Sequence, residues 1–484
     1  MKHCILAVDI GTSGARAVLF DTQARALAQA RVPYAMRFPR DGWAEQDPET
    51  VVQAVLHVLK AGVRALPKDM PLAAVVLSAQ MYSILALSTG GEVLSPSLTW
   101  ADTRSAPFAV AARARSTAEL ALRTGCPLQA SYPLAKIMWL RAQGHLPPDA
   151  RFVSIKDYVT LRLCGQMLAD WSCASASGLL DIHQMQWDAE ALALCGITPA
   201  HLPPLCSPRH LVRAWAANTL HYTGLPPEAP LILGAGDAPL ANIGVGATAA
   251  GTLAVNIGTS AAARVLTTNP RVDAAGRLWT YVADEGHWTT GGIIGGGGMV
   301  YEWLVNTLLD GERGEQRFAE AERLAATVPA GADGLLFIPY FSGEQSPGWN
   351  PQARGLLFGL TLAHGRGHLL RAGIEGLMFA LRRAADVLAG QSPFDTVYLT
   401  GGVTASPLWA QTLADVFGVR VVVPQSSESS ARGAAILGWL ALGAAADYAA
   451  FAQPEHALLP DAGRHTLYTE RCAAFNALYE QMQK

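Results

Sequence analysis

The stretch LAVDIGTSGARAVL, residues Leu6–Leu19, returns later in the chain as LAVNIGTSAAARVL, residues Leu253–Leu266. The two copies are 247 residues apart and are identical at ten of fourteen positions. Each copy predicts an apolar strand, a Gly-Thr-Ser turn and a second strand, which together make a hairpin. A repeat of this kind indicates a duplicated unit, with one copy in each half of the chain.

The turn in each copy has the composition of a phosphate-binding loop. Gly11-Thr12-Ser13 and Gly258-Thr259-Ser260 both offer backbone N–H groups and hydroxyls to phosphate oxygens. Asp9 in the first copy is Asn256 in the second, so only the first turn brings a carboxylate to a hard cation such as Mg²⁺. Read singly, each turn also fits an ordinary hairpin. The pairing of two turns favours two lobes that close on one polyphosphate.

The composition indicates a large globular protein. Its 484 residues favour two domains, and charged residues make up only 15%, against about 25% in typical chains. The net charge of −3 argues against a nucleic-acid partner. The longest uncharged apolar stretch, residues 433–446, is shorter than the ~20 residues that span a bilayer, so no membrane partner is expected. Seven cysteines without a CxxC pair favour free thiols in a cytoplasmic protein.

Strands alternate with helices in both halves, which predicts an α/β fold with mixed sheets. Strands are expected at residues 73–78, 231–233 and 396–399, and helices at 133–141 and 407–417. The repeat places a domain boundary near residue 247. The predicted domains are therefore 1–247, which carries the first phosphate turn, and 248–484, which carries the second.

A carboxylate stands directly after one of the predicted strands. Asp237 follows the strand at 231–233 through Gly234-Ala-Gly236. Ligands of α/β proteins bind at the carboxyl ends of strands, so Asp237 is a candidate base that accepts a proton from a substrate hydroxyl. An aspartate that caps the following helix explains the same spacing equally well.

A glycine pair follows the strand at 396–399. Gly401 and Gly402 would let an adenosine lie against the backbone, and Ser406 opens the next helix. An ordinary turn between strand and helix is the alternative interpretation.

Two further segments offer the mixed donors and acceptors that a polyhydroxy substrate needs. They are Gln80-Met81-Tyr82, and Trp100-Ala-Asp102-Thr-Arg104 with its indole as an apolar wall. A surface Asp/Arg pair is the alternative for the second segment. The chain has no GxxxxGK[ST] loop and no HExxH motif.

With these motifs, the chain resembles the FGGY carbohydrate kinases, which share a superfamily with hexokinase and actin. Ser131-x-Pro133-x-x-Lys136-Ile137-x-Trp139-Leu140 is similar to the first family signature, and the stretch from Gly355 to Glu375 is similar to the second. The resemblance implies a two-lobed actin/hexokinase-like (ribonuclease H-like) fold with duplicated α/β domains, an interdomain cleft, and closure of the lobes on substrate.

The same resemblance implies a role for each candidate residue. Asp237 would be the catalytic base, and Asp9 would assist Mg²⁺. The sugar would be bound by Gln80, Met81, Tyr82, Trp100, Asp102 and Asp237. ATP would be bound by Gly11, Thr12, Ser13, Gly258, Thr259, Ser260, Gly401, Gly402 and Ser406.

The resemblance does not select one substrate, because different segments resemble kinases of different sugars. The segments 99–102, 154–158, 174–179 and 290–292 look like those of gluconate kinases, whereas Gln80-Met81 looks like the Gln-Met-His of xylulose kinases, with Tyr82 in place of the histidine. Because residues 78–83 show no added cation for a carboxylate, D-xylulose is favoured slightly over gluconate. A sugar-independent ATPase of the heat-shock or actin type and a catalytically idle sugar sensor stay open as other classes, as does a homodimer.

Overall fold

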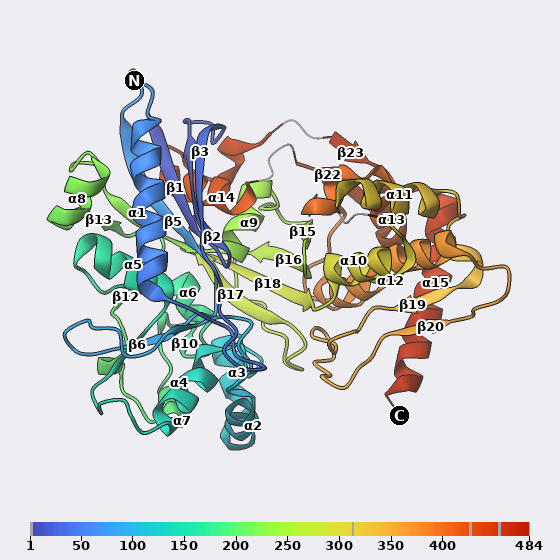
Figure 1. Ribbon diagram of the computed structural model, residues 1–484, viewed down its shortest axis with the longest axis horizontal. Helices are drawn as coiled ribbons and strands as arrows, with labels where there is room; N and C mark the ends of the chain where they lie inside the picture. Colours follow the sequence, from blue (N-terminus) through green and yellow to red (C-terminus); the bar gives the residue numbers. More distant parts are fainter. Residues whose placement is uncertain (1–2, 312–313, 425–427, 454–455, 484) are drawn as a thin grey trace. The chain divides into compact units, whose positions relative to one another are not determined.

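A computed structural model describes residues 3–311, 314–424, 428–453 and 456–483 (Figure 1). The chain forms two compact units. The first comprises Met1–Thr248, Leu266–Thr289 and Glu428–Ala452, and the second comprises Ala249–Val265, Thr290–Ser427 and Gln453–Lys484. The opening segment thus ends one residue beyond the boundary expected at 247, and two later segments of the chain also belong to the first unit.

The first unit is built on a six-stranded sheet with strand order β13-β14-β5-β1-β2-β3. Its strands are β1 (Cys4–Ile10), β2 (Gly14–Phe20), β3 (Ala26–Pro33), β5 (Leu72–Ala79), β13 (Leu211–Val212) and β14 (Leu231–Gly236). Strand β1 is antiparallel to β2 and parallel to β5, β14 is parallel to β5, and β13 is antiparallel to β14.

The strands within the second unit repeat this arrangement. They are β15 (Thr252–Ile257), β16 (Ala261–Thr267), β21 (Thr396–Thr400), β22 (Arg420–Val423) and β23 (His456–Leu458), in the order β16-β15-β21-β22-β23. Strand β15 is antiparallel to β16 and parallel to β21, β22 is parallel to β21, and β23 is antiparallel to β22. The order and directions match β2-β1-β5-β14-β13, so the sequence repeat marks a duplicated fold with mixed sheets.

The remaining helices and strands are divided between the two units. The helices of the first unit are α1 (Pro48–Arg64), α2 (Ala106–Arg115), α3 (Ala118–Thr124), α4 (Pro133–Ala142), α5 (Ile155–Cys164), α6 (Trp171–Ser175), α7 (Ala189–Cys195), α8 (Ala217–Thr223), α9 (Asp237–Val245) and α14 (Ser429–Ala441). Its shorter strands are β4 (Glu45–Gln46), β6 (Leu85–Leu87), β7 (Ser97–Leu98), β8 (Arg151–Val153), β9 (Ala169–Asp170), β10 (Leu180–Asp181), β11 (Gln186–Trp187), β12 (Leu205–Cys206) and β17 (Trp279–Asp284). Strand β18 (His287–Ile294) leads the chain into the second unit, which adds α10 (Gly297–Leu308), α11 (Glu315–Ala326), α12 (Arg366–Ala389), α13 (Pro407–Phe417), α15 (Ala462–Met482), β19 (Leu336–Ile338) and β20 (Leu356–Phe358).

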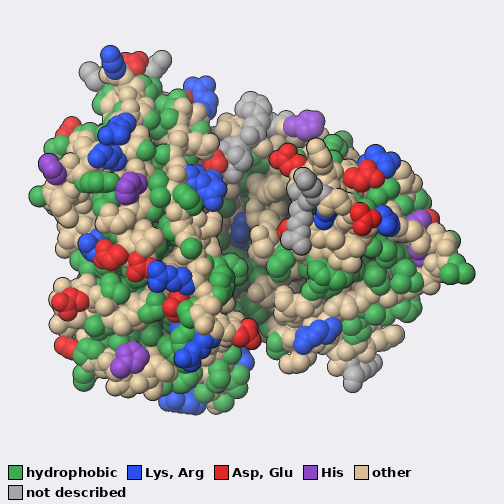
Figure 2. All heavy atoms as spheres, viewed as in Figure 1, with side chains coloured by type: hydrophobic (Ala, Val, Ile, Leu, Met, Phe, Trp, Pro, Cys, Tyr) green, Lys and Arg blue, Asp and Glu red, His purple; other side chains and the backbone are tan. Residues whose placement is uncertain are grey.

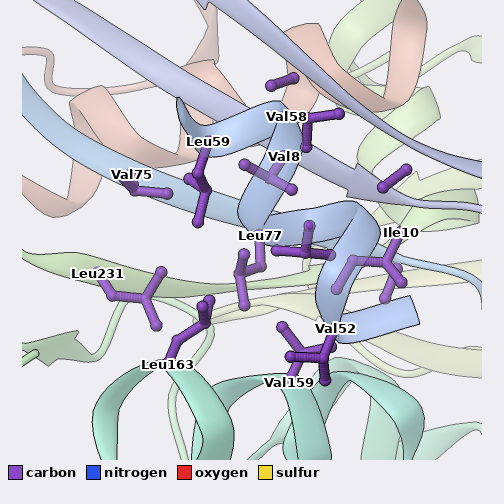
Figure 3. Close-up of a cluster of buried hydrophobic side chains, with 14 of the residues drawn as sticks. Val8, Ile10, Val52, Val58, Leu59, Val75, Leu77, Val159, Leu163 and Leu231 are labelled. Atoms are coloured by element: carbon purple, nitrogen blue, oxygen red, sulfur yellow. The ribbon is translucent and has the colours of Figure 1, made fainter. Parts of the chain in front are cut away.

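Alternation along β1 gives the first sheet two apolar faces. Leu6, Val8 and Ile10 point to a cluster formed with α1 and α5, part of which is drawn in Figure 3. Ile5 and Ala7 point to the opposite cluster, formed with α9 and α14. Because successive side chains of a strand face opposite sides, one apolar strand serves both layers, and the sheet is covered on both faces.

Helix α14 shows why late residues belong to the first unit (Figure 1, orange beside the green α9). A Cβ on Gly433 would lie 1.9 Å from the Leu240 carbonyl oxygen, and one on Gly244 would lie 1.8 Å from the Ser429 carbonyl oxygen. The two glycines therefore allow α14 and α9 to pack backbone against backbone, which a larger residue would prevent.

The surface agrees with the balanced composition. On the face drawn in Figure 2, basic and acidic side chains are interspersed over the first unit. All seven cysteines are free thiols. Among the described residues, each helix is too short or too polar to cross a membrane.

Candidate active site

Three parallel strands of the first unit end at one edge of the sheet. The strand register places Asp9 beside Ser78, and Ser78 beside Ala235. The residues that follow these strands, which are the first Gly-Thr-Ser turn, Gln80 and Asp237, therefore lie at the same edge. This is the edge where α/β folds bind ligands.

Thr12 joins the first turn to the predicted sugar segments. Its hydroxyl donates to Gln80 Oε1 at 3.2 Å and accepts from Trp100 Nε1 at 3.0 Å. Gln46 Nε2 donates to the Thr12 carbonyl at 2.7 Å, and Gln80 Nε2 donates to Gln46 Oε1 at 2.7 Å. The predicted phosphate turn and sugar loop are thus parts of one hydrogen-bonded group. Gln46 was missed from the sequence because nothing in its neighbourhood marks it.

Three other contacts hold the same turn. The Gly11 N–H donates to the Gly14 carbonyl at 3.1 Å, and the Tyr34 hydroxyl donates to the Gly11 carbonyl at 2.6 Å. Arg31 donates to the Ser13 hydroxyl at 3.2 Å. An arginine beside an exposed hydroxyl suits the approach of an anion.

Asp9 has the environment of a cation ligand. Its Oδ1 accepts from the Ser78 hydroxyl at 2.7 Å, and Arg16 opposite it forms an ion pair with Glu428. Burial raises the pKa of the Asp9 carboxyl, while the Ser78 hydrogen bond and the Arg16 charge lower it and Glu428 raises it. A desolvated carboxylate gains from a nearby cation.

The donor set around Asp9 fits Mg²⁺. Among the described residues, no three His, Cys, Asp or Glu side chains gather as a metal site. Mg²⁺ commonly uses one or two carboxylates, keeps several waters and takes its remaining ligands from substrate phosphates. One carboxylate beside a phosphate-type turn is what that mode of binding requires.

Asp237 begins α9 directly after β14. Its Oδ1 accepts from the Ala238 N–H at 2.8 Å, and its side chain is partly exposed. Gly234 has φ +66°, and a Cβ there would lie 1.7 Å from the Leu77 carbonyl oxygen. Glycine therefore lets β14 lie close to β5, which sets where Asp237 emerges.

Ser172 on α6 fixes the backbone just before Asp237. Its hydroxyl oxygen accepts from the Gly236 N–H at 3.1 Å, and Asp170 caps the helix by accepting from the Cys173 N–H at 2.9 Å. Ser172 was missed from the sequence, since only the fold brings α6 to the end of β14.

We expect Ser172→Ala to lower kcat about tenfold or more, with little change in the KM for ATP, because small displacements of a reacting group are costly. Steady-state kinetics measure this change. Ser175→Ala is the matched control on the same helix. The Ser175 hydroxyl donates to the Ser172 carbonyl at 2.7 Å and accepts from the Val282 N–H at 3.0 Å, so its removal keeps the Ser172 hydroxyl that accepts from the Gly236 N–H. Equal losses of kcat in both variants would contradict a specific effect on Asp237.

Tyr82 and Met81 lie in an aromatic cluster next to Asp237. The hydroxyls of Tyr82 and Tyr132 lie 3.0 Å and 2.7 Å from the Tyr281 hydroxyl. A Cβ on Gly236 would lie 2.8 Å from the Met81 side chain, so glycine makes room for Met81. Tyr132 lies within the first family signature, between Ser131 and Pro133, whereas the local sequence of Tyr281 carries no such signal.

The small cavity behind this loop is not large enough for a sugar. It has a volume of about 30 Å³ and is lined by Gln80, Tyr82, Asp157 and Cys173 among others. A space of this size holds one or two waters.

Trp100 and Asp102 differ in how far they are open to a ligand. Trp100 is 44% exposed, whereas Asp102 is fully buried. Asp102 accepts from the Ala44 N–H at 2.8 Å and forms an ion pair with Arg104 at 2.7 Å. The described bonds of Asp102 join its loop to the segment at Ala44 and to Arg104, so its role as a sugar ligand stays a prediction.

The second turn lies in the second unit and packs against a run of glycines, Gly295–Gly298. The Gly258 N–H donates to the Ser260 carbonyl at 2.9 Å, and the Gly298 N–H donates to the Gly258 carbonyl at 2.7 Å. The Met299 N–H donates to the Thr259 carbonyl at 3.2 Å. A Cβ on Gly298 would lie 2.6 Å from the Gly258 carbonyl oxygen, so the start of α10 packs directly on the turn. The sequence shows this run, but its spacing matches no dinucleotide motif, and its supporting role was missed.

The two copies of the repeat use corresponding contacts with different chemistry. Asp9 is the register partner of Ser78 and accepts from its hydroxyl, whereas Asn256 is the register partner of Thr400 and donates to its hydroxyl at 3.0 Å. The second hairpin turn is also one residue shorter, because residues 258–260 replace 11–14 between the paired strands. Arg16 therefore opposes Asp9 in the first copy, and Ala262 opposes Asn256 in the second.

The predicted adenosine segment follows β21. Gly401 has φ +100°, and a Cβ there would lie 2.1 Å from the Ile257 carbonyl oxygen, which brings this segment against the end of β15. A Cβ on Gly402 would meet open space. Ser406 is the N-cap of α13, accepting from the Trp409 N–H at 3.3 Å, and it also bonds Glu322. Its contact with ATP stays a prediction.

Phosphate-type turns on duplicated hairpins, with a carboxylate at the neighbouring strand end, are the features expected of a phosphotransferase. Residues 4–244 match the FGGY family of carbohydrate kinases, N-terminal domain, and residues 253–442 match the C-terminal domain. The chain therefore belongs to the FGGY family of carbohydrate kinases, and it is an ATP-dependent sugar kinase.

Two relatives and one solved structure show how similar this chain is to particular kinases. A gluconokinase of Bacillus subtilis (strain 168) is 35% identical over 454 residues, covering 92% of this chain and 88% of the relative. A xylulose kinase of the same organism is 28% identical over 447 residues, covering 90% and 88%. The structure of gluconate kinase from Lactobacillus acidophilus gives a TM-score of 0.94 at 30% identity, covering 100% and 98%.

The predicted family and the predicted duplicated α/β fold are both confirmed. Within the first unit, the structure brings together Asp9, the first turn, Gln80, Trp100 and Asp237. Within the second unit, it brings together the second turn and Gly401. The individual roles of these residues stay predictions.

Proposed function

We propose that this sugar kinase phosphorylates gluconate, giving 6-phosphogluconate, with D-xylulose as the second candidate substrate. The observation that carries the kinase chemistry is the shared strand edge of the first unit, where Asp237, Gln80 and the first Gly-Thr-Ser turn lie together. A general base, a polar side chain for substrate hydroxyls and a phosphate-type turn are what phosphoryl transfer to an alcohol requires.

In the proposed reaction, Asp237 accepts the proton of a terminal substrate hydroxyl as its oxygen attacks the γ-phosphorus of ATP. The new O–P bond forms, the bond to the β-phosphate oxygen breaks, and ADP leaves. The turn at Gly11–Ser13 and the turn at Gly258–Ser260 hold phosphate oxygens through N–H groups and hydroxyls. Mg²⁺ held through Asp9 and the phosphates would supply neutralising charge. Most of the rate enhancement then comes from positioning and electrostatics.

Gluconate ranks first here, which reverses the order favoured by the loop at 80–83. The support is the higher identity to a gluconokinase than to a xylulose kinase, over similar coverage. Two of the gluconate-like segments support this order: Trp100 bonds Thr12, and segment 174–179 begins within α6, the helix whose Ser172 accepts from the Gly236 N–H. Gln80-Met81 keeps D-xylulose as the second candidate.

A coupled assay of ADP release tests the substrate. It compares gluconate, D-xylulose, ribulose, glycerol and fuculose against a reaction without sugar, with the product identified by mass spectrometry. We expect the highest kcat/KM with gluconate and a mass gain of one phosphoryl group. A higher kcat/KM with D-xylulose would select the second candidate, and equal ADP release without sugar would favour an ATPase.

We expect Asp9→Asn to raise the Mg²⁺ concentration for half-maximal activity about ten- to a hundredfold, because the amide carries no charge for the cation. The variant gives the first copy of the repeat the residue of the second. Ser78→Ala is the matched control, since it removes the hydrogen bond but keeps the carboxylate. Magnesium titrations of ATP turnover measure both variants, and an unchanged Mg²⁺ requirement in Asp9→Asn would refute the metal role.

A further inference from the structure

A buried lysine connects the two predicted sugar segments. Lys136 on α4 is fully buried. Its Nζ donates to the Tyr82 carbonyl at 2.8 Å and to the Thr99 carbonyl at 2.6 Å. Tyr82 ends the segment Gln80-Met81-Tyr82, and Thr99 directly precedes Trp100. One ammonium group therefore bridges two loops that are distant in sequence.

Tyr82 depends on such a restraint more than most residues would. Its φ of +66° lies in the left-handed region, which residues other than glycine rarely adopt. A residue keeps this conformation only where its surroundings hold it. The Lys136 hydrogen bond to its carbonyl is one such contact, and the hydroxyl contact with Tyr281 at 3.0 Å is another.

The charges around Lys136 make it more than a packing residue. Burial lowers the pKa of Lys136 to about 7, Asp102 opposes that shift, and Arg104 adds to it. Asp102 and Arg104 form an ion pair with each other, and Arg104 also pairs with Glu45 at 2.8 Å. Burying an amine costs free energy, and an apolar side chain of similar size would avoid that cost. A lysine at this position is therefore expected to serve geometry, and not stability.

We propose that Lys136 is a positioning residue of the sugar site: its ammonium holds the Tyr82 and Thr99 carbonyls, and so fixes segment Gln80–Tyr82 relative to Trp100. This inference rests on the proposed role of those two segments in sugar binding. It predicts that loss of the ammonium weakens sugar binding selectively and leaves the nucleotide side of the reaction unchanged.

The test compares Lys136→Met, which keeps an unbranched side chain one atom shorter and removes its donors, with Leu140→Ala. Leu140 lies on the same helix, is buried, and belongs to its apolar cluster, so its truncation destabilises packing without touching either carbonyl. We expect Lys136→Met to raise the sugar Kd and KM about ten- to a hundredfold, with the KM for ATP unchanged. Leu140→Ala should lower thermal stability with little effect on the sugar Kd.

The pH dependence adds a readout that a purely structural role would not move. The lysine gives up its proton as pH rises through about 7, and a neutral amine donates a weaker hydrogen bond than an ammonium. The ratio of sugar Kd between Lys136→Met and wild type should therefore be largest at pH 6 and should shrink by pH 9. Between pH 7 and 10.5 the unfolded chain binds this proton more readily, so the contribution of Lys136 to stability rises with pH in wild type and is absent from the variant.

Calorimetric titration of gluconate and of D-xylulose separates the outcomes. Wild-type protein that phosphorylates neither sugar would contradict the proposed function. Active wild type together with an unchanged sugar Kd in Lys136→Met, or with equal losses for sugar and ATP, would overturn the role of Lys136 alone. If Lys136→Met does not fold, two measurements replace it: the sugar Kd of Lys136→Gln and the sugar Kd of wild type from pH 6 to 9. A wild-type sugar Kd that does not change over this pH range would overturn the positioning role of Lys136.

Discussion

Replacing Asp237 by asparagine is expected to lower kcat for sugar phosphorylation by about 10²- to 10⁴-fold, which is the usual contribution of a general base. The amide keeps the size of the side chain and the oxygen that accepts from the Ala238 N–H, so the start of α9 should be preserved. Binding of ATP and of sugar should change little, because the lost function is acceptance of a proton during the reaction. Stopped-flow or coupled assays of turnover, with calorimetric titration of each substrate, measure these quantities separately.

The matched control for this prediction is Asp461→Asn. Asp461 is the N-cap of α15 and accepts from the Arg464 N–H at 2.8 Å. Asparagine caps helices about as well as aspartate, so this variant should retain its turnover. A kcat of Asp237→Asn within tenfold of wild type would contradict the assignment of Asp237 as the base. Asp237 would then have only a structural role in the first turn of α9.

The repeat predicted much of the fold because it encodes local structure. Leu6–Leu19 and Leu253–Leu266 form the two hairpins, and the helix expected at 407–417 is α13. Each depends on neighbours in sequence: apolar alternation, a glycine turn, and a proline at the start of a helix. The position of Asp237 at the end of a strand was predictable for the same reason, since a strand followed by Gly-Ala-Gly-Asp can be read directly. Its role stays a prediction.

The residues that surround these motifs could not be found in this way. Gln46, Ser172 and Tyr281 reach the strand edge from distant segments, and their local sequence carries no mark of it. The one-residue difference between the hairpin turns was also hidden, because the two copies align without a gap and the register is set only when strands pair.

Domain organisation shows the same limit. A repeat predicts where a second domain starts, but it does not predict which later segments return to the first. Helix α14 does so because Gly433 and Gly244 permit a close helix pair with α9. The sequence of a Gly/Ala-rich helix does not show which helix will pack against it. The pairing of α14 with α9 is therefore visible only in the folded structure.

Replacing Gly401 by alanine is expected to disrupt the nucleotide side of the site through the backbone of the second unit. Gly401 has φ +100° and ψ −179°, a region that only glycine adopts readily, so the strain alone costs about 1–3 kcal/mol. A Cβ would also lie 2.1 Å from the Ile257 carbonyl oxygen, at the end of the strand that carries the second phosphate turn. Relief of that overlap must move β15 or β21, and with it Gly258 or Gly402.

Two measurements separate strain at Gly401 from the loss of an adenosine contact. We expect Gly401→Ala to lower the free energy of unfolding and to raise the KM for ATP, with less effect on sugar binding, since the sugar segments belong to the first unit. Gly402→Ala is the matched neighbour, because its Cβ meets open space and it has no left-handed φ. It should leave the free energy of unfolding unchanged, whatever it does to ATP. If denaturant unfolding shows equal stability for Gly401→Ala and Gly402→Ala, then the close approach of Gly401 to Ile257 does not constrain the fold, and the glycine pair would matter only for the ligand.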